Sequence, residues 1–421
     1  MNAIVLINFV IALLFFLCYL YQFIYIPVTW FKKLPAHREP SPHRFAVLIS
    51  ARNESAVIAQ LIDSIHRQTY DPSLITIFVI ADNCTDQTAD IARRAGAVVY
   101  ERRNELLIGK GYALDELMQH IQEDYPDNPF DAFLVLDADN VLDKHYVEEM
   151  NRTFSDGYRV ITSYRNSKNY GDNWISAGYS LWFLREAKYL NNARMALGNS
   201  CAVSGTGFLF SREIIEKTGG WHFYLLTEDI EFTIYNVLQG EKIGYCPTAI
   251  LYDEQPTDFH QSFRQRLRWA KGFLQVFHTY GAQLIQRTLR GCFSAYDMTM
   301  TTMPAMVLSL LGILMNLTTF VVGLATGNAP LARTGLVILG DYLLSTYLTA
   351  FAMGLVTTIT EWDQIYTTTR KKILYLFTFP LFMLTYVPIA FVALFKKVSW
   401  KPIIHKESKS VDDICSERHA A

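Results

Sequence analysis

The chain has 421 residues, of which 51% are hydrophobic, and this length is sufficient for more than one structural unit. Its formal net charge of -2 disfavours nucleic acid as a partner. The cysteines lie far apart without paired spacing, so neither a zinc site nor a disulfide framework is indicated, and a reduced cytosolic setting fits best. They are Cys18, Cys84, Cys201, Cys246, Cys292 and Cys415.

The first 30 residues carry no charged side chain, and this run exceeds the roughly 20 residues that cross a bilayer core. A cleaved signal peptide is the alternative, but no basic region precedes the apolar run and no small-x-small cleavage site follows a short apolar core. We therefore expect residues 1–31 to form an uncleaved transmembrane anchor. Lys32, Lys33 and Arg38 then place the following segment in the cytoplasm.

Short apolar runs alternate with helical patterns in residues 40–258. Strands are expected at residues 45–50, 75–80, 98–100 and 133–136, and helices at residues 55–66 and 87–95. This alternation predicts an α/β domain with a mostly parallel sheet that is covered on both faces. Polar clusters follow Ser50, Ile80 and Leu136, and in such sheets ligands bind beyond the carboxyl ends of the strands.

The segment Phe133-Leu-Val-Leu-Asp-Ala-Asp139 is the most informative feature of this domain. An apolar strand that ends on two acidic residues one apart can hold a divalent cation against a diphosphate, although a solvated turn is the alternative. No G-x-G-x-x-G follows the first expected strand and no P-loop motif occurs, which disfavours the two common glycine-rich phosphate sites. Lys110 in Gly109-Lys-Gly111 is a further candidate for neutralising phosphate.

Apolar segments return in residues 298–332, 335–360 and 373–395, so we expect transmembrane helices within residues 298–397. Residues 259–297 are expected to form amphipathic interfacial helices, because apolar side chains recur at helical spacing beside basic ones. Residues 398–421 form a polar tail, whose composition from residue 407 onward predicts disorder.

The topology of this C-terminal part stays open at the level of sequence. One span before the soluble domain and three after it would place the C-terminus outside the cell. The lysines that follow the last apolar segment prefer the inside. They are Lys396, Lys397, Lys401 and Lys406. Either one apolar segment is re-entrant or interfacial, or the charge rule fails.

Motifs spread over most of the chain resemble, in their order, those of membrane-embedded, processive family 2 glycosyltransferases. This group contains cellulose, chitin, hyaluronan and poly-N-acetylglucosamine synthases. The motifs are Ala51-Arg52-Asn53-Glu54, Asp82 in Ala81-Asp-Asn-Cys-Thr-Asp86, Gly109-Lys110-Gly111, Asp137-Ala-Asp139, Ser204-Gly205-Thr206-Gly207, Thr227-Glu228-Asp229 and Gln265-Arg-Leu-Arg268-Trp269. The resemblance implies a nucleotide-sugar-binding, GT-A-like α/β domain beside an α-helical transmembrane region.

The resemblance also implies a UDP-sugar donor and a bound Mg²⁺ or Mn²⁺. Asp139 is the implied metal ligand. The implied donor-binding residues are Ala51, Arg52, Asn53, Glu54, Asp82, Lys110, Asp137, Gln265 and Arg268. For Asp82, capping of a turn is the alternative role.

An inverting transfer needs a carboxylate that takes the proton from the acceptor hydroxyl, and by resemblance Asp229 is this general base. The implied acceptor-binding residues are Gly205, Thr206, Glu228 and Trp269. The alternatives are a helix N-cap for Thr227, a flexible turn for residues 204–207 and a surface helix for residues 263–277. Ser163-Tyr-Arg-Asn166 and Trp221 are expected to be surface or packing residues.

These features together predict a processive, inverting synthase that extends a β-linked polysaccharide and feeds it through its own membrane helices. It would be a multi-pass protein of the cell membrane, with a cytoplasmic catalytic domain and membrane lipids as partners. Transfer of one sugar onto a lipid acceptor is the first alternative. A transport or scaffold protein with an inactive transferase domain is the second.

Overall fold

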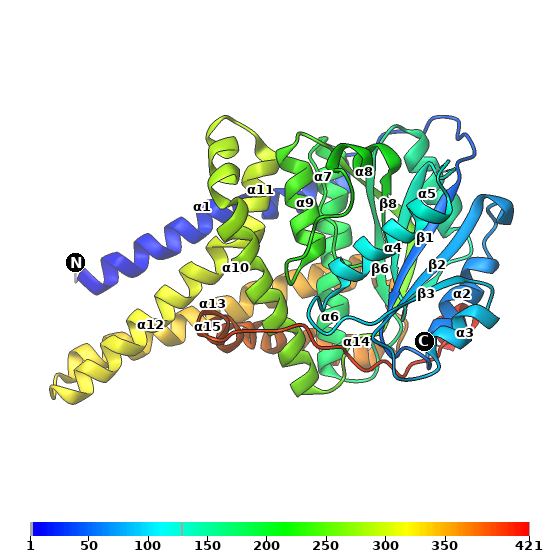
Figure 1. Ribbon diagram of the computed structural model, residues 1–421. Coiled ribbons are helices and arrows are strands. Elements are labelled where there is room, and N and C mark those ends of the chain that lie inside the picture. Colours follow the sequence, from blue (N-terminus) through cyan, green and yellow to red (C-terminus); the bar gives the residue numbers. More distant parts are fainter. Residues whose placement is uncertain (1–2, 128, 421) are drawn as a thin grey trace.

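An eight-stranded sheet forms the centre of residues 45–253 in the computed structural model, which describes residues 3–127 and 129–420. The strand order is β3-β2-β1-β4-β7-β6-β8-β5 (Figure 1). The strands are β1 Phe45–Ala51, β2 Ile75–Asp82, β3 Val98–Arg102, β4 Ala132–Asp137, β5 Val141–Leu142, β6 Val160–Ser167, β7 Phe208–Ser211 and β8 Ile243–Asp253.

The strands expected from the apolar runs form one parallel block. β1 pairs in parallel with β2 and with β4, so that Ile49 lies beside Val79 on one side and beside Leu136 on the other. β3 continues this block, and β6 pairs in parallel with β8. β7 and β5 run antiparallel to their neighbours. The expected α/β fold with a mostly parallel sheet is therefore confirmed.

Both faces of the sheet are covered, because successive side chains of β1 enter opposite cores. Ala46 and Leu48 pack in the core that includes Leu117, whereas Val47 and Ile49 pack in the core on the other face. The helices around the sheet are α2 Ile58–His66, α3 Thr88–Arg94, α4 Lys110–Asp124, α5 Tyr146–Ser155, α6 Trp174–Arg185, α7 Asn192–Leu197, α8 Arg212–Thr218 and α9 Glu228–Leu238. A π-helical turn, Glu186–Asn191, joins α6 to α7.

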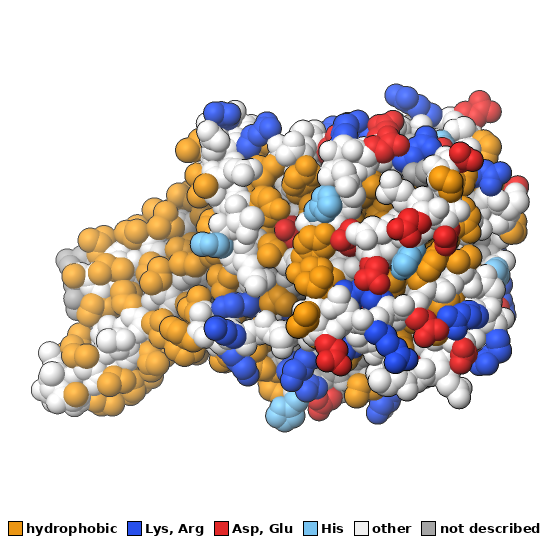
Figure 2. Space-filling view, viewed as in Figure 1, with side chains coloured by type: hydrophobic (Ala, Val, Ile, Leu, Met, Phe, Trp, Pro, Cys, Tyr) orange, Lys and Arg blue, Asp and Glu red, His pale blue; other side chains and the backbone are white. Residues whose placement is uncertain are grey.

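Long apolar helices lie beside this domain. By length and composition, four helical segments of the described residues could cross a membrane: Ala3–Phe31, Val307–Ala325, Ala329–Thr360 and Thr369–Phe395. The first is α1, and the next two belong to α12 Pro304–Ala325 and α13 Ala329–Thr360. These three helices project away from the sheet, and hydrophobic side chains cover the projecting part (Figures 1 and 2). Residues 1 and 2 of the expected anchor lie outside the described residues.

The segment 298–332, expected as one apolar span, is divided. α11 Phe293–Thr302 ends before Pro304, which begins α12, and α12 ends at a turn before α13. Proline has no amide hydrogen for the i to i-4 bond, so it starts a helix more readily than it continues one. The expected interfacial region contains α10 Phe259–Leu289 and the start of α11.

The last apolar segment contacts the sheet domain near its start and helix α10 Phe259–Leu289 near its end. It consists of α14 Thr369–Leu384 and α15 Tyr386–Phe395. Near its start, the Lys371 ammonium donates to the Gly171 carbonyl oxygen at 2.6 Å. Near its end, Lys271 of α10 donates to the Ala393 carbonyl oxygen at 3.0 Å. α12 and α13 instead extend away from the sheet before the chain returns (Figure 1).

A buried ion pair joins the N-terminal helix to the sheet domain. Arg194 of α7 donates two hydrogen bonds of 2.8 Å to the Asp297 carboxylate of α11. Tyr21 and Tyr25 of α1 donate their hydroxyls to the same carboxylate, at 2.9 and 2.8 Å. Because all of these groups are buried, each charge and hydroxyl needs its partner, which fixes α1 against the domain.

The expected disorder of residues 407–421 is wrong for the described part of that segment. Residues 411–420 form α16 Val411–Ala420, and residue 421 lies outside the described residues. Ile414 is buried against Tyr252 and Tyr366, so one apolar side chain docks a segment that is otherwise polar.

Candidate active site

A cleft opens at the carboxyl ends of β1, β2 and β4, where the polar clusters of the sequence meet. We refer to it as the central cleft, and its free volume is about 150 Å³. It is lined by Ser50, Arg52, Glu54, Asp82, Lys110, Asp137, Ala138, Asp139, Arg165, Gly205, Glu228, Asp229, Asp253, Glu254, Gln265, Arg268, Trp269, Trp400, Lys401, Pro402, Ile403 and His405.

Most side chains expected in the site therefore share one cavity. Ala51, Asn53 and Thr206 are absent from its lining. Ala51 is buried as the last residue of β1, and Asn53 shapes the loop by accepting the Thr85 amide hydrogen at 2.8 Å. Direct contact of these three side chains with a ligand is thus not supported by the cavity.

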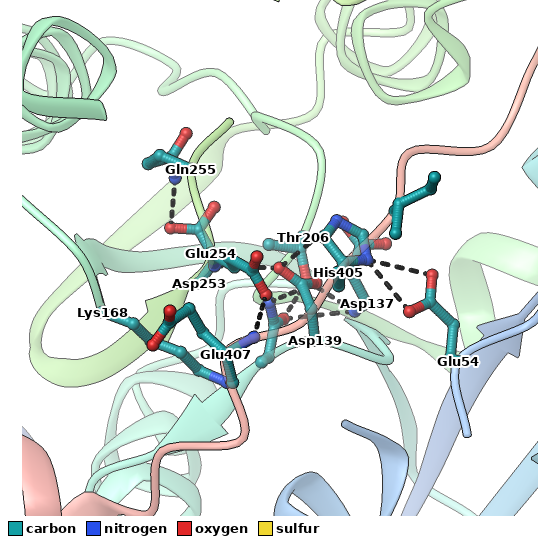
Figure 3. A network of polar contacts seen from close by, with 12 residues as sticks. Glu54, Asp137, Asp139, Lys168, Thr206, Asp253, Glu254, Gln255, His405 and Glu407 are labelled. Atoms are coloured by element: carbon teal, nitrogen blue, oxygen red, sulfur yellow. Dashed lines mark hydrogen bonds and ion pairs between the residues drawn. The ribbon is translucent and has the colours of Figure 1, made fainter. Parts of the chain in front are cut away.

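The loop after β4 holds both acidic residues of the Asp137-Ala-Asp139 motif in fixed positions. The Asp137 amide donates to the Thr206 hydroxyl at 2.9 Å, and that hydroxyl donates to Asn140 at 2.5 Å. The buried Asp139 carboxylate accepts the Glu254 amide hydrogen at 2.9 Å (Figure 3). Thr206, expected at the acceptor, instead uses its hydroxyl to support this loop.

Lys110 brings a positive charge to the same loop. It is the first residue of α4 and follows Gly109, whose φ of +148° favours glycine. Its ammonium donates to the Asp137 carboxylate and, at 2.8 Å, to the Gly205 carbonyl oxygen. Burial would lower the pKa of Lys110, but the charge of Asp137 raises it, so this side chain stays cationic.

Two adjacent carboxylates, Glu228 and Asp229, begin helix α9. Asp229 accepts the Gly205 amide hydrogen at 2.6 Å, and the helix N-terminus favours negative charge here. Burial raises the pKa of Asp229, which makes it a better proton acceptor than an exposed carboxylate. Thr227 does not cap the helix, because its hydroxyl has no partner among the described residues.

The pH dependence of turnover is expected to report this carboxylate pair. Burial and the charge of Asp229 raise the pKa of Glu228 to about 7. A base must be unprotonated to accept a proton, so kcat/KM should rise as the pH increases through this range. Glu228→Gln leaves a single carboxylate, so the titration step near pH 7 that belongs to the pair should be lost and the rising limb should lie at lower pH. Initial rates from pH 5 to 9 measure this shift, and an unmoved limb would show that the pair does not set it.

Helix α10 supplies one wall of the cleft. Arg268 donates to the Leu226 carbonyl oxygen at 2.8 Å, and the buried Gln265 side-chain oxygen has no partner among the described residues. Trp269 makes edge contacts with Tyr179 and Phe183, at centroid distances of 5.7 and 6.2 Å. Its half-buried ring lines the cleft and can offer a surface to a sugar.

Helix α10 packs against other parts of the protein and does not simply lie on a membrane surface. Arg266, one of the basic side chains of this helix, is buried, and its guanidinium carbon lies 4.3 Å from the centroid of the Phe382 ring of α14. Its guanidinium donates to the Thr385 hydroxyl at 2.6 Å. The helix is therefore packed between the sheet domain and the α14–α15 segment.

Several cleft residues were not expected from the sequence. Arg165, expected as a surface or packing residue, lines the cleft and donates to Asp253 at 2.6 Å. Asp253 is the last residue of β8, and ligands bind beyond the carboxyl ends of strands in such sheets. Asp253 was therefore missed because β8 was not predicted as a strand. Glu254 follows it directly. His405 carries no sequence signal for the site, since it lies in the polar tail. Trp221 is fully buried, as expected of a packing residue.

The charges of the cleft suit a divalent cation together with a diphosphate. The carboxylates of Glu54, Asp137, Asp139, Asp253 and Glu254 share this small cavity. Oxygen donors of this kind are the ligands that Mg²⁺ and Mn²⁺ prefer. Within the described residues, no three His, Cys, Asp or Glu side chains are grouped to hold a metal by themselves. This arrangement fits an ion that completes its coordination with phosphate oxygens and water.

The fold and this cleft together form an α/β domain with a candidate ligand site at the strand ends, and comparison with known proteins identifies its family. Residues 42–272 match the family described as "Glycosyltransferase like family 2". This match covers more than half of the chain, and the protein belongs to the family 2 glycosyltransferases, which are enzymes.

Curated relatives of the chain include synthases of different products. The chain is 28% identical over 284 residues to "Probable glycosyltransferase YdaM" of Bacillus subtilis, with 62% of each chain covered. It is 28% identical over 263 residues to the β-monoglucosyldiacylglycerol synthase of Nostoc sp., covering 61% of this chain and 54% of the relative. It is 23% identical over 237 residues to the poly-β-1,6-N-acetyl-D-glucosamine synthase of Staphylococcus aureus, with 54% of each covered. The matches thus span less than two thirds of these relatives.

A solved structure with the same fold is that of the mannosyltransferase PcManGT from Pyrobaculum calidifontis, in complex with GDP-Man and Mn²⁺. The TM-score is 0.54 at 14% sequence identity, and the alignment covers 92% of this chain and 99% of the other. At this identity the likeness concerns the fold.

Proposed function

We propose that the protein is an inverting, metal-dependent transferase that moves a sugar from a UDP-sugar to an acceptor hydroxyl at the membrane surface. The observation that carries this proposal is the position of Asp229 in the same cleft as Lys110 and Asp139. A proton acceptor thus lies next to groups that can hold a diphosphate. The acceptor oxygen attacks the anomeric carbon and gives its proton to Asp229. The bond from that carbon to the diphosphate breaks, and its electron pair leaves with UDP.

The other cleft residues have roles that follow from their charges. Lys110, Arg268 and Gln265 can bind the diphosphate, since two are cationic and the side-chain amide nitrogen of Gln265 can donate hydrogen bonds to phosphate oxygens. Asp82 lies at the nucleotide end, where it already accepts from Arg102 at 2.7 Å. A Mg²⁺ or Mn²⁺ ion held at Asp139 would offset the negative charge that develops on the departing diphosphate.

Processive extension of a β-linked polysaccharide is the form of this activity that we propose. Trp269 supports it, because an indole in the cleft wall can hold the terminal sugar of a chain after each transfer. A relative that makes poly-β-1,6-N-acetyl-D-glucosamine also supports it. In this proposal Gly205 and Glu228 approach the acceptor beside Trp269, and the growing polysaccharide is the second substrate.

Replacement of the Trp269 ring is expected to shorten the product. Trp269→Ala removes the proposed sugar platform, and loss of about 1.4 kcal/mol of binding would raise the acceptor KM roughly tenfold. Trp269→Phe keeps an aromatic face and should retain most of the product length. The measurement is the length distribution of radiolabelled product on a gel, alongside the rate of UDP release. Equal product lengths in all three proteins would contradict the platform role.

A lipid acceptor is the second candidate, favoured by the course of α14–α15. The start of this segment contacts the sheet domain and its end contacts the expected interfacial helix α10, so we propose that α1, α12 and α13 cross the membrane while α14–α15 lies at its cytoplasmic surface. Three crossing helices offer little room for a polysaccharide channel. The Nostoc relative is a glycolipid synthase. A product carrying a single added sugar in the gel assay would favour this candidate.

The same topology places the proposed catalytic domain in the cytoplasm of a multi-pass protein of the cell membrane. The lysines after α15 then lie inside, in agreement with the charge rule. We propose the corresponding division of the chain into an anchor at residues 1–31, a transferase domain at 40–258, interfacial helices at 259–297, membrane-associated helices at 298–397 and a tail at 398–421.

A further inference from the structure

Residues 396–410, which contain the first half of the polar tail, run from the end of α15 across the central cleft. In Figure 1 the tail runs from α15 past α14 and along the lower side of the sheet domain toward α3. Trp400 lies over the Arg52 guanidinium, with 5.4 Å between the guanidinium carbon and the ring centroid. Lys401, Pro402 and Ile403 line the cleft itself. The tail is therefore a wall of the site, although it follows the transferase domain by more than a hundred residues.

Glu254 fixes the tail and the metal-binding loop together. Its carboxylate accepts the amide hydrogens of Lys406 and Glu407, each at 2.9 Å. Its own amide donates to Asp139 at 2.9 Å (Figure 3). One residue thus sets the distance between the Asp139 carboxylate and the tail segment that faces it.

His405 is the tail side chain that faces Asp139. Its Nδ1 lies 3.0 Å from both oxygens of the Glu54 carboxylate. Its Nε2 lies 3.9 Å from Oδ2 of Asp139, which is too long for a hydrogen bond. Among the described residues, Nε2 has no hydrogen-bond partner. Glu54 therefore orients an imidazole whose other nitrogen faces the metal-binding carboxylate (Figure 3).

We propose that His405 is a ligand of the catalytic cation, which Nε2 of His405 and Oδ2 of Asp139 hold between them. This inference rests on the proposed function and adds a ligand from the tail. Two ligand atoms that each lie about 2.1 Å from one ion are about 3.0 Å apart when the ligand–ion–ligand angle is about 90°, and about 4.2 Å apart when it is about 180°. The distance of 3.9 Å between Nε2 of His405 and Oδ2 of Asp139 lies between these values. In metal-bound histidines, the ring nitrogen that does not bind the metal commonly donates a hydrogen bond to a carboxylate. Glu54 is positioned to accept such a hydrogen bond from Nδ1 of His405.

This assignment explains two features of the cleft. The first is that no three possible metal ligands are grouped among the described residues. An aspartate and a histidine are sufficient for an ion whose remaining ligands are diphosphate oxygens and water. The second is the docking of the polar tail, because His405 reaches Asp139 only while Glu254 holds the tail. A nitrogen ligand also favours Mn²⁺ over Mg²⁺, which prefers oxygen donors.

The test measures Mn²⁺ binding to the full-length protein in detergent, in the presence of UDP and without turnover. Pulsed electron paramagnetic resonance of the bound Mn²⁺ should detect a directly bound ¹⁴N nucleus, and labelling of the histidines with ¹⁵N should change that coupling. His405→Ala should abolish the coupling and weaken Mn²⁺ binding by on the order of 10- to 100-fold. His278→Ala, which alters an exposed histidine of α10, should leave both unchanged. Glu54→Gln should weaken binding while the nitrogen coupling remains.

The outcomes separate this inference from the proposed function. A Mn²⁺–UDP complex of the wild-type protein without histidine nitrogen coupling would overturn the role of His405 and leave the transferase intact. This spectrum needs no variant, so the test holds even where His405→Ala fails to fold. Retention of the coupling in a folded His405→Ala protein would overturn it equally. Failure of the wild-type protein to bind Mn²⁺ and UDP at all would instead overturn the proposed function.

Discussion

Asp229→Asn is expected to lower kcat by about 10²- to 10⁴-fold, the usual contribution of a positioned general base. The amide has nearly the same shape as the carboxylate and can still accept the Gly205 amide hydrogen, so the loop and the start of α9 should stay in place. UDP binding should therefore change little. The measurement is the rate of UDP release in a coupled assay, together with UDP affinity by calorimetry.

A matched control for this prediction is Asp63→Asn. Asp63 is an exposed carboxylate on α2 that pairs with Arg67 at 2.9 Å, away from the cleft. Such exposed pairs contribute little, so the control should turn over at the wild-type rate. Wild-type turnover by a folded Asp229→Asn protein would remove Asp229 from the mechanism.

Asp139→Asn is expected to remove the metal dependence of donor binding and to abolish turnover. Asp139 is buried in the cleft, where loss of its negative charge leaves Mg²⁺ or Mn²⁺ without its carboxylate ligand. UDP should then bind with the same low affinity in the presence of Mn²⁺ and in the presence of a chelator, whereas the wild-type protein should bind more tightly with Mn²⁺. Calorimetric titrations of UDP with and without Mn²⁺ measure the difference.

Asp143→Asn serves as the control for a nearby carboxylate. Asp143 follows β5, does not line the cleft and accepts the His145 amide hydrogen at 3.0 Å. This variant should retain metal-dependent UDP binding. If Asp139→Asn retained it as well, the cation would have to be held elsewhere.

The sheet and the cleft residues that follow β1, β2 and β4 were predictable because local sequence patterns indicate them. Strands buried on both faces read as unbroken apolar runs, and parallel strands present their following residues at one edge. Hence Glu54, Asp82 and Asp137, which are far apart in sequence, could be expected in one cleft, and all three line it.

The rest of the site depends on pairings without a local signal. β8 contains Pro247 and pairs in parallel with β6 through an irregular register, so Asp253 does not read as the end of a buried strand. Arg165 of β6 lines the cleft beside Asp253 only because β6 and β8 pair. His405 lies 351 residues from Glu54, in a tail whose composition indicates disorder.

The membrane region shows the same limit. Hydropathy identifies apolar segments long enough to cross a bilayer, but the direction of a helix relative to the bilayer depends on what its ends contact. The polar contacts of Lys371 and Lys271 near the two ends of α14–α15 come from tertiary packing. Sequence alone left these alternatives open for that reason.

We expect this chain to release UDP from a UDP-sugar by a transfer that needs a divalent cation. The most direct measurement incubates the detergent-purified protein with UDP-glucose, UDP-N-acetylglucosamine, UDP-glucuronate and UDP-galactose, singly and in pairs, with Mn²⁺ or a chelator. UDP release and a β-linked product should appear with at least one donor or pair, and only when the cation is present. Release that continues in the chelator, or a product of retained α configuration, would contradict this expectation.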